Sequence, residues 1–242
     1  MNATQGGIIV IDGPDGTGKA TTTRLVLEML NASQSLGGKK FLSASFPNYR
    51  EYFGQLVRNY LDGDSADEIV RVPAKIRDNP LLASWPYAAD RYETYHEVMR
   101  PQIEKGTWFL LDRYICSNLA HQGAKIDDED ERHKFGLKTM LLEHGYLGLP
   151  EANLTIILNL PEEIRRARVI ARRAQVADNR GQVGQADIHE QNDAYMTAVA
   201  AEYLQLAEAN SWIVVGCTAG DVELTPEQVA TKVYETIVEW IT

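Results

Sequence analysis

The chain has 242 residues, and its 24 lysines and arginines against 34 aspartates and glutamates give a net charge of −10. With 44% hydrophobic and 24% charged residues, the composition is that of a globular protein, which excludes the disordered and collagen-like classes. The acidic balance argues against a protein that wraps nucleic acid, so we expect no nucleic-acid partner. We expect one domain over residues 1–242, because this length suits a single large α/β domain better than two.

The sequence also bears on the compartment. No apolar run approaches the roughly 18 residues that a membrane-spanning helix requires, so we expect no membrane partner. The first seven residues lack the basic stretch and apolar segment of a secretory signal. Cys116 and Cys217 cannot form a disulfide framework, and each is expected to be a small buried hydrophobic side chain. A cytoplasmic location is the resulting expectation.

Strand and helix patterns alternate along the chain. This alternation predicts a parallel sheet with helices on both faces, a three-layer α/β fold. Ligands of such sheets bind at the carboxyl ends of the strands, where Asp12, Phe46 and Asp112 should meet. In chain order, we expect a strand at 7–12, a helix at 20–32, a strand at 41–46, a helix at 52–61, a helix at 84–104 limited by Pro86 and Pro101, strands at 108–112 and 154–160, a helix starting at Pro161, a helix at 196–209, a strand at 212–215 and a helix at 225–240.

A glycine-rich segment follows the first predicted strand directly. Residues 13–19 match the G-x-x-x-x-G-K spacing of a P-loop and lie between a strand and a helix, as phosphate binding requires. The backbone N–H groups of such a loop surround phosphate oxygens, and Lys19 would bridge the outer phosphates. A turn that binds nothing is the plain alternative, which the constrained spacing disfavours. The predicted nucleotide-binding residues are Gly13, Pro14, Asp15, Gly16, Thr17, Gly18, Lys19, Ala20 and Thr21.

Position 20 departs from the P-loop pattern. Ser or Thr normally stands there and its hydroxyl holds Mg²⁺, whereas this chain has Ala20. Either Thr21 substitutes for the missing hydroxyl, or carboxylates and water hold more of the metal. Asp15 and Asp112 are the candidate carboxylates for Mg²⁺, directly or through water.

A second polar corner follows the strand at 108–112. Asp112 offers a carboxylate to Mg²⁺ or its waters, and Arg113 offers a guanidinium fork to a second phosphate. A structural ion pair between the two is the alternative interpretation. The base-reading motif N-K-x-D is absent from the sequence, which weighs against a GTP-dependent switch.

Several motif blocks occur in the order and at the spacing of one family, from about residue 8 to residue 206. Together they resemble the thymidylate kinase family. The blocks are Asp15-Gly16-x-Gly18-Lys19, Phe46-Pro47-Asn48-Tyr49, Ala88-Ala89-Asp90-Arg91-Tyr92, Asp112-Arg113-Tyr114 with Ser117 to Gly123, and Asp187-Ile188-His189-Glu190 with the helix around Tyr203 and Leu206.

The resemblance implies a reaction and a binding site. The γ-phosphate of ATP would pass to the 5′-phosphate of dTMP, giving dTDP and ADP, in a homodimeric P-loop kinase. Tyr87 would stack on thymine, Arg91 would hydrogen-bond the base, and Asn118 would read its edge. Arg113 would bind the acceptor phosphate, and Asp15 would lie near the sugar 3′-hydroxyl and the metal. The implied substrate-binding residues are Phe46, Tyr49, Tyr87, Arg91, Arg113, Ser117, Asn118, His121 and Gln122.

The chain departs from the family pattern in the acceptor site. Asn48 stands where many members carry an arginine, and His121 where an aromatic ring commonly blocks a ribose 2′-hydroxyl. The stretch 65–80 is longer than usual. A kinase for another deoxynucleotide or for a deoxynucleoside therefore remains an alternative. Ala20 leaves open a nucleotide-binding module without transfer activity. Without the resemblance, Tyr87 and Tyr92 could both be core aromatics.

Arginines are concentrated after the strand at 154–160. An exposed basic helix face is the plain interpretation. The sharper one is a small mobile lid at about 172–187, because residues 177–186 are polar and contain glycine. In the family, a glycine at position 16 accompanies a catalytic arginine from the lid. The candidate catalytic residues are Lys19, Asp15, Asp112, Arg113, Arg172, Arg173 and Arg180.

Overall fold

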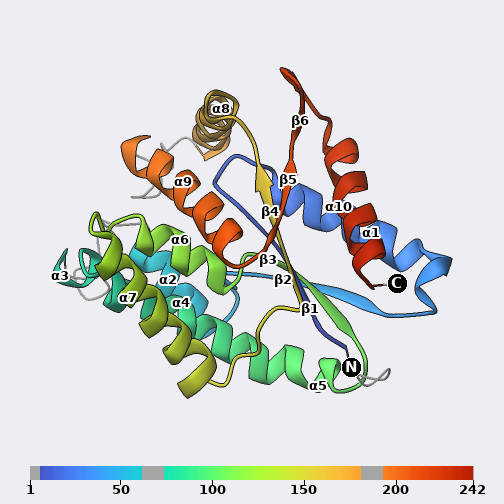
Figure 1. The fold of residues 1–242 in the computed structure, drawn as a ribbon, viewed down its shortest axis with the longest axis horizontal. Coiled ribbons are helices and arrows are strands. Elements are labelled where there is room, and N and C mark those ends of the chain that lie inside the picture. The colour runs from blue at the N-terminus through green and yellow to red at the C-terminus, as the bar shows by residue number, and fades with distance from the viewer. Residues whose placement is uncertain (1–5, 62–73, 181–192, 242) are drawn as a thin grey trace.

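The computed structural model describes residues 6–61, 74–180 and 193–241 (Figure 1). At its centre lies a five-stranded sheet in the order β2-β3-β1-β4-β5, and all strand pairs in it are parallel, as predicted. The strands are β1 (Ile8–Asp12), β2 (Phe41–Ser45), β3 (Trp108–Asp112), β4 (Leu154–Asn159) and β5 (Ile213–Gly216).

Helices cover both faces of this sheet. α1 (Lys19–Ala32) and α10 (Pro226–Ile241) pack on one face, against Ile9 and Ile11 of β1. Ile8 and Val10 point to the other face, because successive side chains of a strand alternate. That face carries α4 (Pro80–Thr94), α5 (Arg100–Ile103), α6 (Ile115–Gly123) and α9 (Asp193–Ala209). The central strand is therefore buried on both sides.

Further elements complete the layers. α2 (Tyr52–Leu61) packs on α4, and α7 (Glu129–Met140) packs on α4 and α6. The remaining elements are η1 (Gln34–Leu36), α3 (Ala74–Arg77), the π-helical turns η2 (Tyr95–Met99) and η3 (Leu141–Tyr146), α8 (Glu162–Arg180) and the antiparallel hairpin β6 (Thr218–Ala219) and β7 (Val222–Glu223). Within the described ranges, no helix combines the length and apolarity needed to cross a bilayer.

Some sequence-based boundaries are wrong. The helix expected at 84–104 begins at Pro80, because the Asn79 side chain accepts a hydrogen bond from the backbone N–H of Leu82 at 3.0 Å and caps it. Pro86 lies inside this helix and does not limit it. The helix at 129–140 and the hairpin β6–β7 were not predicted. Residues 172–180 of the expected lid continue α8, and residues 181–187 lie outside the described residues.

The carboxyl ends of three strands meet as expected. The backbone N–H of Phe46 donates to the carbonyl of Asp112 at 3.0 Å, and Ile11 is the register partner of Asp112. Asp12 ends β1 one residue further on. Because parallel strands present their carboxyl ends at one edge, the loops after β1, β2 and β3 form a common site there.

Candidate active site

The loop after β1 has a backbone that only glycine tolerates. Gly13 has a φ of 140° and Gly16 a φ of 88°. A Cβ at Gly13 would lie 2.5 Å from the carbonyl oxygen of Leu158, and one at Gly16 would lie 2.7 Å from that of Arg165. The loop therefore turns tightly against β4 and α8. Gly18 precedes α1 without a capping side chain, so the first N–H groups of this helix are available to a phosphate.

Lys19 is buried at the centre of this loop. Its Nζ donates hydrogen bonds to the carbonyls of Gly13 at 2.9 Å and Pro14 at 3.1 Å, and lies 3.4 Å from Oδ1 of Asp15. Burial lowers the pKa of Lys19, and the nearby charge of Arg113 lowers it further. Ala20 and Thr21 are both exposed at the start of α1.

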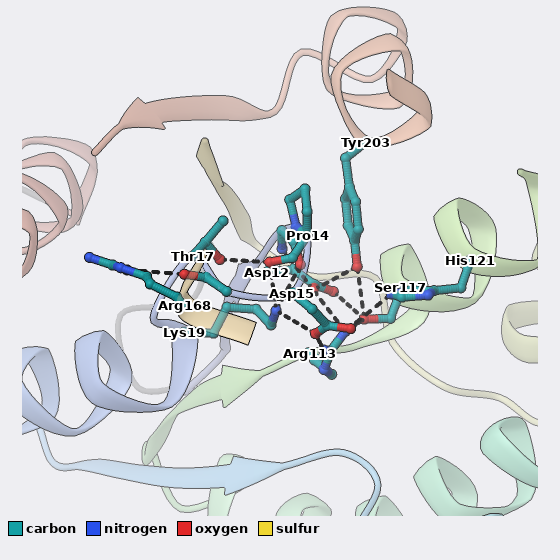
Figure 2. A network of polar contacts seen from close by, with 12 residues as sticks. Asp12, Pro14, Asp15, Thr17, Lys19, Arg113, Ser117, His121, Arg168 and Tyr203 are labelled. Atoms are coloured by element: carbon teal, nitrogen blue, oxygen red, sulfur yellow. Dashed lines mark hydrogen bonds and ion pairs between the residues drawn. The ribbon is translucent and has the colours of Figure 1, made fainter. Parts of the chain in front are cut away.

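The carboxylate of Asp12 organises the polar groups around the loop (Figure 2). Oδ1 accepts hydrogen bonds from the backbone N–H of Gly13 at 2.8 Å and the hydroxyl of Tyr203 at 2.9 Å. Oδ2 accepts from Ser117 Oγ at 2.7 Å and Cys116 Sγ at 3.0 Å. Asp12 was expected at the strand end, but its role as a shared acceptor was not predicted. The available signal was an acidic residue directly before the glycine loop.

Arg113 and Asp15 form the ion pair that joins the β3 corner to the glycine loop (Figure 2). Arg113 has a φ of 71°, an uncommon conformation outside glycine, and its N–H donates to the carbonyl of Ile11 at 3.1 Å. Burial alone would raise the pKa of Asp15, but the charges of Arg113 and Lys19 hold it well below its usual range. Asp15 is therefore an anion at neutral pH. Arg113 forms its close ion pair with Asp15 and not with Asp112, the partner considered from the sequence.

His121 lies beside this pair, with Nε2 3.4 Å from Nη1 of Arg113. Burial and the charge of Arg113 lower the pKa of His121 to about 4. The imidazole is therefore neutral at pH 7, so it does not add a positive charge to the site.

Asp112 carries an acceptor that the protein leaves unused. Its Oδ1 is buried and has no hydrogen-bond partner among the described residues. Burial raises the pKa of Asp112, while Lys19 and Arg113 oppose this rise. The described residues contain no cluster of three or more His, Cys, Asp or Glu side chains that could bind a metal by themselves. A cation here would need oxygen ligands from water and phosphate in addition to Asp112.

A cavity next to the glycine loop brings the expected substrate residues together. They come from the loop after β2, from α4 and from the β3–α6 corner, and Asp15 closes the cavity on the loop side. All of the residues expected to bind substrate line it, namely Phe46, Tyr49, Tyr87, Arg91, Arg113, Ser117, Asn118, His121 and Gln122. Tyr87 is therefore not a core aromatic, and Tyr92, the other tyrosine of α4 considered for the core, is 42% exposed.

A buried ion pair lies at the wall of this cavity, and only its arginine lines the cavity. Arg91 is 2% exposed and Glu143 of η3 is 0% exposed, and the two are joined by two hydrogen bonds. Sequence reasoning missed Glu143. The sequence did contain a signal for it. Phe135, Thr139 and Glu143 are four residues apart, so on a helix Glu143 lies on the same buried face as the other two.

Asn48, which stands in place of an expected arginine, has a structural role. Its N–H donates to the carboxylate of Asp90 at 3.1 Å, and its Nδ2 donates to Oγ1 of Thr94 at 3.2 Å. Both contacts attach the loop after β2 to α4. Burial raises the pKa of Asp90 to about 6, opposed by the hydrogen bond from Asn48.

The arginines of α8 differ in their surroundings. Arg165 is buried and donates to the carbonyl of Leu160, and Arg168 donates to the carbonyl of Gly16 at 3.0 Å and pairs with Glu223. The charge of Arg172 contributes to the low pKa of Asp15, so this residue lies within electrostatic reach of the glycine loop. Arg173 and Arg180 lie further along α8, where the structure describes the helix but not these side chains.

A larger hollow of about 820 Å³ lies elsewhere, between α7 and α9. It is lined by Phe135, Met140, Leu206 and Trp212 among others, and contains none of the residues expected to bind substrate, nucleotide or metal. Size alone would single out this hollow, but the charged side chains converge at the glycine loop.

Comparison with known proteins agrees with this geometry. The model of the thymidylate kinase family matches residues 11–229. A thymidylate kinase of Synechococcus sp. (strain CC9902) is 31% identical over 207 residues, which cover 86% of this chain and 87% of that protein. A probable thymidylate kinase of Pyrococcus abyssi is 32% identical over 68% of this chain and 71% of its own length.

A solved structure shares the fold. The thymidylate kinase of Candida albicans superimposes with a TM-score of 0.63 at 23% sequence identity, over 100% of this chain and 96% of its own. The match of the family model over most of the chain is the decisive finding. The chain therefore belongs to the thymidylate kinase family.

Proposed function

We propose that the chain phosphorylates dTMP with ATP at the junction of the glycine loop and the adjoining cavity. An oxygen of the 5′-phosphate of dTMP forms a bond to the γ-phosphorus of ATP. The bond from that phosphorus to the β,γ-bridging oxygen breaks, and ADP leaves with the electron pair. The observation that carries this proposal is the convergence of the base-binding and phosphate-binding candidates in one cavity beside the loop.

The glycine loop and Lys19 bind the phosphates of ATP in this proposal. The carbonyls of Gly13 and Pro14 hold the Lys19 ammonium over the loop, where the charge of a triphosphate would concentrate. Phosphate oxygens can replace these carbonyls as acceptors. Such a reaction needs little covalent help from the protein, because catalysis consists of positioning and charge neutralisation.

Arg113 binds the acceptor phosphate. It lines the cavity and contacts Asp15 of the loop, so it lies between the two substrates. A guanidinium can bind two phosphate oxygens at once, which positions as well as attracts the acceptor. Arg172 is our candidate for the arginine that stabilises the transferring group, because its charge reaches Asp15.

The residues fit Mg²⁺ held mainly through water and ATP. Mg²⁺ keeps several of its waters, and the unpartnered buried Oδ1 of Asp112 can accept a hydrogen bond from one of them or bind the ion directly. Asp15 is a second candidate but already pairs with Arg113. When bound, the ion would neutralise negative charge on the phosphates.

Substrate choice tests the proposed function. ADP release should be observed with dTMP and be much weaker with dGMP and with thymidine, which lacks a phosphate. Lys19→Ala should lower kcat by several orders of magnitude, because it removes a charge where negative charge concentrates. Lys39→Ala, at an exposed position, is the control. Near-normal turnover of Lys19→Ala, or a preference for another acceptor, would contradict the proposal.

Acceptor recognition can be tested separately. Arg113→Ala should raise KM for dTMP at least about tenfold while KM for ATP changes far less, since a charge-assisted contact to the acceptor phosphate is removed. Arg24→Ala serves as control, because that exposed arginine forms its ion pair with Glu28 on the surface of α1. Loss of ATP affinity with dTMP affinity retained would show that the two sites are assigned in reverse.

Metal dependence tests the role of Asp112. In a Mg²⁺ titration at saturating ATP and dTMP, Asp112→Asn should raise the Mg²⁺ concentration for half-maximal activity and lower kcat sharply. Ala20→Ser should change turnover only modestly, because Mg²⁺ is satisfied by water in place of one protein oxygen. A Mg²⁺ curve unchanged by Asp112→Asn would remove this residue from metal binding. If the wild type is inactive at every Mg²⁺ concentration and Ala20→Ser is active, the chain is a nucleotide-binding protein that has lost kinase activity.

We further propose that the enzyme is a cytoplasmic homodimer. Its cysteines are both free and buried, as is usual in a reducing compartment. The support for a dimer is an exposed apolar stripe on α4 at helical spacing, made by Leu82, Trp85 and Tyr92, which are 37%, 52% and 42% exposed. A surface of this kind favours contact between copies of the chain.

Sedimentation measurements test the dimer. Trp85→Glu should shift wild-type dimers to monomers at micromolar concentration, because a charge would be buried at the centre of the contact. Val222→Glu changes another exposed apolar side chain, in hairpin β6–β7, and should leave the dimer intact. A monomeric wild type, or dimers of Trp85→Glu as stable as the wild type, would exclude this interface.

A further inference from the structure

Glu143 is a buried carboxylate behind the wall of the substrate cavity. It lies in η3, directly after α7, and is 0% exposed. It does not line the cavity itself, yet its partners Arg91 of α4 and Asn118 of α6 both do. One carboxylate thus connects two cavity residues that come from different helices.

The contacts of Glu143 use specific atoms of Arg91. Nε donates to Oε2 at 2.6 Å, and Nη2 donates to Oε1 at 2.5 Å. This two-point contact fixes the plane of the guanidinium. Burial would lower the pKa of Arg91, but the charge and hydrogen bonds of Glu143 raise it, so the side chain stays charged. Its remaining N–H groups, on Nη1 above all, can only donate.

The same carboxylate sets the orientation of the Asn118 amide. Nδ2 of Asn118 donates to Oε1 of Glu143 at 3.1 Å and to the carbonyl of Ser84 at 3.2 Å. Both partners are acceptors, so the NH₂ group must face them, and a flipped amide would place oxygen against oxygen. The amide oxygen therefore remains as an acceptor that receives no hydrogen bond from any residue the structure describes.

This pattern distinguishes pyrimidine bases. Arg91 offers a donor and Asn118 an acceptor, which complement the O4 carbonyl and N3–H of thymine or uracil. Cytosine has a donor amino group at position 4 and an acceptor at N3, so it opposes both protein groups. We propose that Glu143 is a positioning residue that excludes cytosine nucleotides by fixing the orientation of the Arg91 donors and the hydrogen-bonding polarity of the Asn118 amide. The inference rests on the proposed function, since it concerns the acceptor of that reaction.

Structural stabilisation does not explain this arrangement by itself. Burying an ion pair has a large desolvation cost, so such pairs are weak contributors to stability compared with apolar residues of similar size. Both carboxylate oxygens of Glu143 accept hydrogen bonds from side chains that line the cavity, Arg91 and Asn118. A purely structural role would lower the amount of active enzyme without altering its choice between bases.

The test is Glu143→Gln assayed with dTMP, dUMP and dCMP at saturating ATP. Glutamine has one oxygen and one NH₂ group, so it cannot accept all the hydrogen bonds that Glu143 accepts, and the Asn118 amide is free to flip. We expect the ratio of kcat/KM for dTMP to that for dCMP to fall at least about tenfold. The ratio for dTMP to dUMP should stay nearly constant, because these bases have the same groups at positions 3 and 4.

Comparing substrates on one preparation separates specificity from folding. The ratio does not depend on the fraction of enzyme that is active, so partial unfolding cannot mimic the effect. Glu202→Gln is the matched control, because Glu202 is also a buried glutamate paired with an arginine, Arg132 at 3.5 Å, but its ion pair involves neither Arg91 nor Asn118. Its substrate ratios should equal those of the wild type.

An equal loss of activity with all three nucleotides would overturn the proposal and assign Glu143 a structural role. If Glu143→Gln yields no active protein, Glu143→Asp keeps the charge but withdraws it by one methylene, and its dTMP-to-dCMP ratio should also fall. Calorimetric affinities for the three nucleotides give the same comparison without turnover. A wild type that does not phosphorylate dTMP would contradict the proposed function instead, which keeps the two failures distinguishable.

Discussion

The completely buried carboxylate of Asp12 is the group on which the arrangement of the active site depends. A charge at the end of the central strand is tolerable only if its oxygens are hydrogen-bonded. The donors come from Gly13 in the loop, Cys116 and Ser117 in α6, and Tyr203 in α9. Satisfying one anion therefore determines how the glycine loop and two helices sit relative to one another.

Two ion pairs then define the two ends of the substrate cavity. Arg113 and Asp15 lie at the end where we propose that the phosphates bind, and there each would exchange its partner for a substrate group or a metal. Arg91 and Glu143 lie at the end where we propose that the base binds, with Arg91 lining the cavity and Glu143 buried behind it. The partly exposed pair of Arg113 and Asp15 can rearrange when substrates bind. The buried pair of Arg91 and Glu143 holds the guanidinium in one orientation.

The local charge of the site differs from that of the chain. The net charge of −10 would repel nucleotides from an average surface point. At the loop, however, Lys19, Arg113 and Arg172 together hold the pKa of Asp15 low, which shows a positive local potential. These cations would therefore attract an anionic substrate to the loop despite the negative net charge of the chain.

The sequence by itself determined the glycine loop, the parallel sheet and the cavity residues. The loop depends on local backbone geometry, and strands buried on both faces have uninterrupted apolar patterns. The cavity residues stood in motif blocks whose spacing resembles one family, so they could be named before any contact was known. Only the tertiary structure revealed Glu143, the role of Asp12 and the pairing of Arg113 with Asp15. Each is a charged side chain whose partner is distant in sequence or belongs to another element, and a sequence pattern contains no distances. Helix limits such as Pro80 were decided in the same way, because a capping side chain and tertiary packing outweighed the local preference of Pro86.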